Sequence, residues 1–184
     1  MLLMVNNVSS YSNNLEECLN KLNTKYVVHK YDELDDCSIS NYDGIILSGR
    51  TKSVKAMNVS NMNILKSAYK DDKPLLGICY GVEITVLTFS GSLQRLNNRI
   101  IGDNNITVKK ESILTKRNTL NVFENHGYHI ARLPEEFICI ADSSSCKYEI
   151  IAHTKKHIFG TQFHPEMSID GMEILRNFVG LTKN

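Results

Sequence analysis

The chain has 184 residues, of which 42% are hydrophobic, and it contains 10 glycines and 3 prolines. A chain of this length buries enough surface to fold as one compact domain over residues 1–184 without disulfides or a structural metal. Its 21 basic and 20 acidic residues give a formal net charge of +1 and form no basic block. This balance argues against nucleic acid and anionic membranes as partners and leaves small molecules or proteins.

The cysteines are odd in number and none forms a C-x-x-C pair, so they predict neither a disulfide framework nor a zinc site. They are Cys18, Cys37, Cys79, Cys139 and Cys146. The apolar start at residues 1–5 is too short for a signal peptide, and no run approaches 18 apolar residues. We therefore expect a cytoplasmic protein that uses no metal and no cofactor.

Strand and helix patterns alternate over the first ninety residues. Continuous apolar runs, typical of strands buried on both faces, predict strands at residues 1–5, 44–49 and 75–78, and residues 25–31 are interpreted as a further strand. Helical spacing predicts helices at about 15–22, 54–69 and 82–89, with Asn13 or Asn14 as the N-cap of the first. This alternation predicts an α/β fold with a mostly parallel open sheet and helices on both faces.

The pattern changes after residue 93. Short strand candidates at 106–109, 120–123, 137–141 and 148–152 are separated by polar residues and indicate a smaller antiparallel section. A strand at 158–163 and a helix at about 170–179 end the chain.

The most informative motif is the G-x-C-x-G run at residues 77–81, where a buried strand meets a helix. In such a turn the flanking glycines avoid collisions with neighbouring backbone, and Cys79 is presented at the carboxyl end of the strand. The partial positive charge of the helix N-terminus is expected to lower the pKa of the Cys79 thiol. The backbone N–H of Tyr80 is placed to donate to a developing oxyanion.

A cysteine nucleophile needs a base, and His164 follows the strand at 158–163. Pro165 favours an extended conformation for His164. Two residues after the histidine, Glu166 can accept a hydrogen bond from the second ring nitrogen and fix the tautomer. Cys79, His164 and Glu166 are therefore the predicted catalytic residues.

With these motifs, the chain resembles the class I (triad) glutamine amidotransferases. The matching segments are residues 47–49, 74–81, 125–128 and 160–166. The resemblance implies a flavodoxin-like core and hydrolysis of the side-chain amide of L-glutamine through a γ-glutamyl thioester on Cys79. It also implies delivery of ammonia to a synthase partner and weak turnover by the chain alone. The predicted oxyanion and substrate-binding residues are Gly49, Arg50, Tyr80, Gly81, Glu83, Asn125, Gly127 and Tyr128.

The synthase partner is less specified. Residues 5–15 are similar to glutaminase subunits of anthranilate and aminodeoxychorismate synthases, and residues 125–128 to the small subunit of carbamoyl-phosphate synthetase. Residues 133–137, 145–149 and 174–178 resemble the stand-alone glutaminase subunit of GMP synthase. We favour the GMP synthase relationship.

The chain departs from the family pattern at three positions. Arg50 follows Gly49 where the family has a second glycine, so Arg50 can supply an oxyanion N–H only if the turn avoids positive φ or tolerates the strain. Glu83 replaces a substrate-holding glutamine, and its carboxylate could hold the substrate ammonium but would repel the substrate carboxylate. Tyr128 stands where the GMP synthase pattern has an acidic residue. The triad stays whole, whereas substrate affinity is in question.

Other functions are compatible with these residues. The chain could be a catalytically weakened homologue that binds or regulates, given Arg50 and Glu83, or a γ-glutamyl hydrolase or cysteine peptidase. His126 is expected either to orient the glutamine-binding loop or simply to pack inside it.

Overall fold

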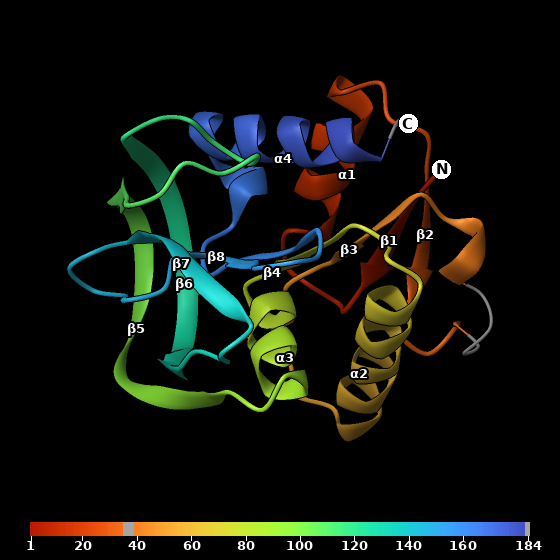
Figure 1. The fold of residues 1–184 in the computed structure, drawn as a ribbon, viewed down its shortest axis with the longest axis horizontal. Helices are drawn as coiled ribbons and strands as arrows, with labels where there is room; N and C mark the ends of the chain where they lie inside the picture. The colour runs from red at the N-terminus through yellow and green to blue at the C-terminus, as the bar shows by residue number, and fades with distance from the viewer. Residues whose placement is uncertain (35–38, 183–184) are drawn as a thin grey trace.

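The computed structural model describes residues 1–34 and 39–182, and Cys37 lies outside this part. In these residues nine strands form one sheet with the order β2-β1-β3-β4-β9-β8-β7-β5-β6 (Figure 1). The neighbouring strands from β2 to β9 are parallel, and those from β9 to β6 are antiparallel. The predicted α/β class, with a parallel sheet and an antiparallel section, is confirmed.

The parallel half of the sheet follows the predicted apolar runs closely. Its strands are β1 (Leu2–Asn6), β2 (Tyr26–Lys30), β3 (Gly44–Leu47), β4 (Leu75–Ile78) and β9 (Ile158–Thr161). Every residue of β3, β4 and β9 is buried, because helices cover both faces of the sheet.

Helices lie in two layers, α1 (Ser12–Lys21) with α4 (Ile169–Leu181) on one face and α2 (Lys55–Lys70) with α3 (Tyr80–Thr88) on the other (Figure 1). Side chains alternate across a strand, so Leu2 and Met4 join the core under α1 and α4. Leu3 and Val5 join the core under α2 and α3.

The predicted cap of the first helix is wrong. Tyr11 is the N-cap of α1 and makes no side-chain capping bond, while Asn13 and Asn14 lie inside the helix. Packing of the apolar face of α1, rather than a capping side chain, therefore sets where this helix begins.

The antiparallel half differs from the prediction in strand length. Its strands are β5 (Ser92–Val108), β6 (Thr119–Arg132), β7 (Phe137–Asp142) and β8 (Ile150–His153). The candidates at 106–109 and 120–123 are parts of the long hairpin β5–β6, because most residues of β5 are partly or fully exposed and carry polar side chains. Apolar patterning cannot outline a strand of that kind.

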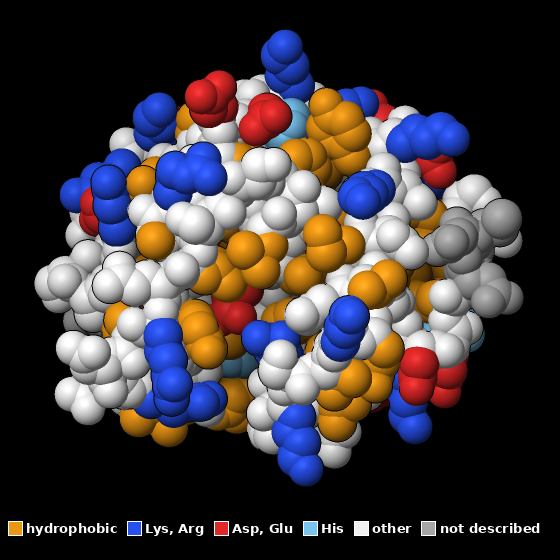
Figure 2. Space-filling model, turned by 90° about the horizontal axis from the view of Figure 1, so that it is seen from below, with side chains coloured by type: hydrophobic (Ala, Val, Ile, Leu, Met, Phe, Trp, Pro, Cys, Tyr) orange, Lys and Arg blue, Asp and Glu red, His pale blue; other side chains and the backbone are white. Residues whose placement is uncertain are grey.

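Short helices η1 (Ile39–Asn41) and η2 (Pro165–Met167) complete the described elements. None of the helices in the described part of the chain is long and apolar enough to span a membrane. Figure 2 shows the face that carries α2 and α3, where basic side chains are dispersed among hydrophobic and acidic ones and the surface is hollowed near its middle.

Candidate active site

The turn at Cys79 joins β4 directly to α3. Cys79 has φ 50° and ψ −101°, a conformation that costs energy for a residue with a side chain. A Cβ at Gly77 would lie 2.5 Å from the backbone of Gly81, and a Cβ at Gly81 would lie 2.4 Å from the carbonyl oxygen of Leu47. Both glycines are therefore required by close backbone packing, as the motif predicts.

The electrostatics of Cys79 differ from the prediction. Burial raises the pKa of the Cys79 thiol well above its usual value, and the nearby carboxylates of Glu83 and Glu166 raise it further. A hydrogen bond from the backbone N–H of Tyr80 acts in the opposite direction but does not outweigh them. The expectation that the helix N-terminus leaves this pKa lowered is wrong, because desolvation dominates. The resting thiol keeps its proton, so attack by the sulfur requires a base.

His164 lies beyond β9, the parallel neighbour of β4. The backbone N–H of Cys79 donates to the carbonyl of Thr161 at 2.8 Å, which ties the two strand ends together. Nδ1 of His164 lies 2.8 Å from Oε1 of Glu166, and both side chains are buried. This contact fixes the ring and leaves Nε2 as the free nitrogen.

Gly49 lies close to both the predicted nucleophile, Cys79, and the predicted base, His164. A Cβ at Gly49 would lie 2.9 Å from Cε1 of His164 and 3.7 Å from the Cβ of Cys79. The histidine and the cysteine therefore border the same backbone turn. Arg50, the next residue, is not at positive φ, so its N–H can face the site from an unstrained turn.

The side chain of Arg50 contacts residues of α2 and α3 beside Cys79. Its guanidinium lies 4.1 Å from the ring centre of Tyr80 and 3.7 Å from a carboxylate oxygen of Glu83. It also donates to Oδ1 of Asn58 at 3.2 Å. These contacts keep the Arg50 side chain against α3 and direct its charge to Glu83.

A cavity of about 180 Å³ opens beside the nucleophile. It is lined by Arg50, Thr51, Ser53, Cys79, Tyr80, Glu83, Arg99, Asn125, His126, Gly127 and Tyr128. The structure thus brings together most of the predicted substrate-binding residues. Gly81 does not line the cavity and packs under β3, and Gly49 contacts the catalytic pair from outside it.

Glu83 is the acidic group of this cavity. Burial raises the pKa of Glu83 to about 7, although Arg50 and His126 lower it in part. The side chain is 5% exposed. Near neutral pH it is therefore present both as the acid and as the carboxylate.

Sequence reasoning missed two residues that contact the site. Tyr11 lies edge-on to the ring of His164, with 4.5 Å between ring centres, and its hydroxyl accepts from Nδ2 of Asn125 at 2.6 Å. Arg99, from β5, donates to both the side chain and the backbone carbonyl of Asn125. No spacing in the sequence signals either residue, because their partners lie far along the chain.

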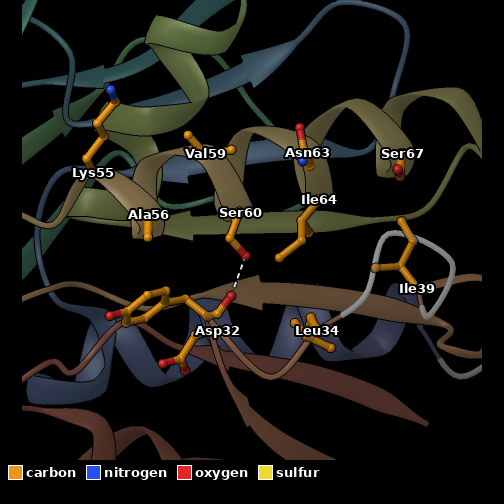
Figure 3. Close-up of a pocket in the computed structure, with 11 residues that line it drawn as sticks. Asp32, Leu34, Ile39, Lys55, Ala56, Val59, Ser60, Asn63, Ile64 and Ser67 are labelled. Carbon is orange, nitrogen blue, oxygen red and sulfur yellow. Dashed lines mark hydrogen bonds between the residues drawn. The ribbon is translucent and has the colours of Figure 1, made fainter.

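A larger cavity of about 550 Å³ lies between α2 and the end of β2 (Figure 3). Apolar side chains such as Leu34, Val59 and Ile64 dominate its walls, and Ser60 donates to the backbone carbonyl of Tyr31 across it. The described residues that line it include neither a cysteine nor a histidine. The smaller cavity at Cys79 is therefore the candidate active site.

Comparisons with known proteins show the family of the chain. The family model of the class-I glutamine amidotransferases matches residues 3–181. The GMP synthase [glutamine-hydrolyzing] of Macrococcus caseolyticus is 36% identical over 159 residues, and that of Staphylococcus epidermidis 37% over 161. Each match covers 81% of this chain, but the chain spans only 31% of the length of these relatives.

Solved structures have the same architecture. The crystal structure of a putative GMP synthase subunit from Thermoplasma acidophilum matches with a TM-score of 0.89 and 26% identity, covering 98% of this chain and 92% of that one. A glutamine amidotransferase from Thermotoga maritima matches in fold with a TM-score of 0.83 at 16% identity, covering 100% and 98%.

Proposed function

Because the chain belongs to the class-I glutamine amidotransferase family, we propose that it hydrolyses the side-chain amide of glutamine and supplies the ammonia to a GMP-forming synthase. The observation that supports this most directly is the placement of Cys79 and His164 around Gly49, with Glu166 on the second nitrogen of the histidine. This arrangement contains a nucleophile, a base and a group that orients the base.

The proposed reaction follows from these positions. Sγ of Cys79 attacks the amide carbon, and its proton passes to Nε2 of His164 while Nδ1–H donates to Glu166. The raised pKa of the Cys79 thiol makes this proton transfer part of the attack. The tetrahedral oxyanion accepts hydrogen bonds from the backbone N–H groups of Arg50 and Tyr80.

Collapse of this intermediate breaks the carbon–nitrogen bond. His164 returns the proton to the departing nitrogen, which leaves as ammonia, and a γ-glutamyl thioester stays on Cys79. Water, deprotonated by His164, attacks the thioester; the carbon–sulfur bond breaks, the thiol regains a proton and glutamate leaves. No other reactant is required.

GMP synthase is the favoured destination of the ammonia because the relatives at 36% and 37% identity carry that name. This chain aligns with less than a third of their length, so the GMP-forming step would take place outside residues 1–184. The similarity of residues 5–15 to anthranilate and aminodeoxychorismate synthase subunits remains the alternative.

The direct test is glutamate release by the chain mixed with the synthetase part of a GMP synthase. Cys79→Ala should lower the rate by about 10³-fold or more, because no other group replaces the nucleophile. Cys146→Ala is the matched control, since Cys146 is also buried but lies in the turn before β8. An unchanged rate in Cys79→Ala would remove the proposal.

A second candidate is a weakened homologue that binds glutamine without turning it over. The observation in its favour is the buried carboxyl of Glu83 in the cavity, beside Arg50. Mass spectrometry of the chain after incubation with glutamine separates the two, because a γ-glutamyl adduct on Cys79 forms only if the attack occurs.

A further inference from the structure

Three buried polar residues lie next to the turn that carries Gly49 and Arg50. Asn7 follows β1, Ser48 follows β3 and Asn61 is on α2, and they are 0%, 2% and 0% exposed. A buried polar group costs free energy unless it is hydrogen-bonded, so three of them at the ends of apolar strands call for a physical reason. The proposed reaction uses none of the three.

The two asparagines form a reciprocal amide pair. Nδ2 of Asn61 donates to Oδ1 of Asn7 at 2.7 Å, and Nδ2 of Asn7 donates back to Oδ1 of Asn61 at 3.1 Å. Each amide also donates to a backbone carbonyl, Asn61 to that of Met57 at 2.8 Å and Asn7 to that of Ser48 at 3.1 Å. Because a carbonyl oxygen only accepts, turning either amide over would place two acceptors against each other. The pair therefore has one orientation, in which it holds the Ser48 carbonyl.

The side chain of Ser48 holds the next peptide group. Its hydroxyl accepts from the backbone N–H of Asn7 at 2.9 Å and donates to the carbonyl oxygen of Gly49 at 3.0 Å. The peptide between Gly49 and Arg50 is trans, so its C=O and N–H point in opposite directions. A Gly49 carbonyl that is held by Ser48 therefore directs the N–H of Arg50 to the other side of the turn.

The N–H of Arg50 is free to bind an oxyanion. Among the hydrogen bonds between the described residues, none has this N–H as its donor. The preceding Cα borders both predicted catalytic residues, because a Cβ at Gly49 would lie 2.9 Å from Cε1 of His164 and 3.7 Å from the Cβ of Cys79. A donor that is held in place and left unpaired beside a nucleophile and a base is suited to stabilise a developing oxyanion.

The turn is also held on the other side of Arg50. The backbone N–H and the hydroxyl of Thr51 both donate to the carbonyl oxygen of Val8, at 3.1 Å and 2.9 Å. Turning the Gly49–Arg50 peptide over would bring φ of Arg50 to positive values, which glycine adopts freely and other residues rarely adopt. Arg50 in place of a second glycine therefore favours the same orientation that the buried polar residues hold.

We propose that Asn7, Ser48 and Asn61 are positioning residues that hold the backbone N–H of Arg50 toward the oxyanion formed when Cys79 attacks. The inference rests on the proposed function for the reaction and extends it to the residues that arrange the oxyanion site. None of the three lines the cavity beside Cys79, so they act through the turn. Because the oxyanion forms only during the reaction, they should affect kcat and leave KM nearly unchanged.

Ser48→Ala is the smallest change that releases the Gly49 carbonyl. With the synthetase part of a GMP synthase present, we expect kcat for glutamate release to fall by about 10- to 100-fold, because the oxyanion donor is no longer held. KM for glutamine should stay within about threefold of wild type.

Thr182→Val is the matched control for Ser48→Ala. It also removes a buried hydroxyl that donates to a backbone carbonyl, that of Val179, but at the C-terminal end of α4. It should leave kcat and KM within about twofold of wild type. Unchanged kcat in Ser48→Ala, or an equal loss of kcat in Thr182→Val, overturns the proposal.

Variants of the asparagine pair separate positioning from stability. Asn61→Leu leaves the amide of Asn7 without its main partner, so it should lower both the urea midpoint and kcat. The double variant Asn7→Leu/Asn61→Leu removes both buried amides and should recover part of the stability. It still leaves the Ser48 carbonyl without its donor, so kcat should stay low. Recovery of kcat together with stability would indicate a purely structural role and overturn the proposal, and Ser48→Ala decides alone if an asparagine variant fails to fold.

Nuclear Overhauser spectra test the orientation of the turn without turnover or glutamine. In the wild type the amide proton of Arg50 should show a cross-peak to Hε1 of His164, because the neighbouring Gly49 backbone lies against Cε1 of that ring. The cross-peak should weaken in Ser48→Ala and persist in Thr182→Val. Its absence from the wild type overturns the proposal.

The two readouts also distinguish this inference from the proposed function. Absent glutamate release by the wild type, together with the expected cross-peak, would remove the proposed function and the role in catalysis while retaining the orientation of the turn. Normal release by a wild type that lacks the cross-peak would remove only the inference.

Discussion

The parallel and antiparallel halves of the sheet make different contributions to the candidate site. Cys79, His164 and Glu166 follow strands of the parallel half, β4 and β9, whose residues are all buried. One side of the cavity that would contact glutamine, including Arg99 and Asn125, comes from the long hairpin β5–β6, in which most residues of β5 are partly or fully exposed. In the proposed reaction the parallel half supplies the reacting groups and, through Arg50, Tyr80 and Glu83, one side of the cavity, and the hairpin supplies the other side.

Because different parts of the sheet carry these two sets of residues, we expect that the catalytic step and the affinity for glutamine can be altered separately. A change at the ends of the parallel strands should lower kcat, because it affects groups that act only on the reacting atoms. A change in the hairpin should mainly raise KM. Further predictions test this division, from the largest expected effect to the smallest.

Glu166→Gln should have the largest effect. The amide can donate where the carboxylate accepts, so it favours the wrong tautomer of His164, and we expect kcat to fall by about 10²- to 10⁴-fold. Glu173→Gln is the matched control, because Glu173 pairs with Arg117 at the surface 2.9 Å away. Steady-state glutamate release measures both variants. A change in KM without a change in kcat in Glu166→Gln would contradict the proposed division between residues that affect kcat and residues that affect KM.

Gly81→Ala should be the most destabilising change. A Cβ there would lie 2.4 Å from a backbone oxygen of β3, and we expect a loss of about 1–3 kcal/mol in the free energy of unfolding. Gly127→Ala, in the hairpin, meets nothing within 4 Å and should change that free energy by less than about 0.5 kcal/mol. Urea midpoints compare the two variants. Equal losses of stability in the two variants would show that the parallel half and the hairpin tolerate an added methyl group equally well.

Glu83 should make glutamine binding depend on pH. Its pKa of about 7 means that the side chain is mostly neutral at pH 6 and mostly ionised at pH 8, where it repels the substrate carboxylate. We expect KM for glutamine to rise by a few-fold from pH 6 to pH 8 in the wild type and to rise less in Glu83→Gln. The ratio of KM at pH 8 to KM at pH 6 should differ about threefold between the two proteins. Parallel pH profiles in the two proteins would contradict a role for Glu83 in substrate binding.

The same group gives a stability prediction with a definite sign. The pKa of Glu83 is higher in the folded chain than its ordinary value of 4.5, so the native state binds more protons between these values. The stabilising contribution of its protonation is complete below pH 4.5 and is lost as the pH rises through about 7. Urea unfolding of wild type and Glu83→Gln across this range checks the sign, and a wild type that gains stability with rising pH relative to the variant would contradict it.

Val8→Asn should have the smallest effect and should be stabilising. Val8 has φ 60°, a conformation that a β-branched residue rarely adopts, and it is 55% exposed. Asn tolerates this conformation, so we expect a gain of about 1 kcal/mol in the free energy of unfolding. Val59→Asn is the matched control, since Val59 is 51% exposed but lies within α2. Equal changes in the two melting temperatures would show that Val8 is not strained.

The carbonyl of Val8 accepts from the backbone N–H of Thr51 at 3.1 Å, so this strain lies beside the turn that carries Arg50. Glutamate release by Val8→Asn therefore also tests whether this loop affects the turn at Arg50. A change in kcat would show that the strained loop helps to shape that turn.

Prediction from the sequence worked best where structure is local. The apolar run at 75–78 coincides with β4, and the G-x-C-x-G spacing predicted the turn at Cys79 because the flanking glycines are close neighbours in the chain. The pairing of His164 with Glu166 is likewise local, two residues apart. The length of β5 was missed because exposed polar strands lack the apolar signal that buried ones have.

The sequence by itself determined the α/β class and the segments that form the parallel strands. It also determined which residues are the candidate catalytic ones. Only the tertiary structure decided that burial raises the pKa of Cys79, that Tyr11 packs on His164 and that Arg50 pairs with Glu83. Turns and strands depend on neighbouring residues and on side-chain period, which can be read along the chain. Desolvation and contacts between distant segments depend on how the layers pack, and no local pattern records them.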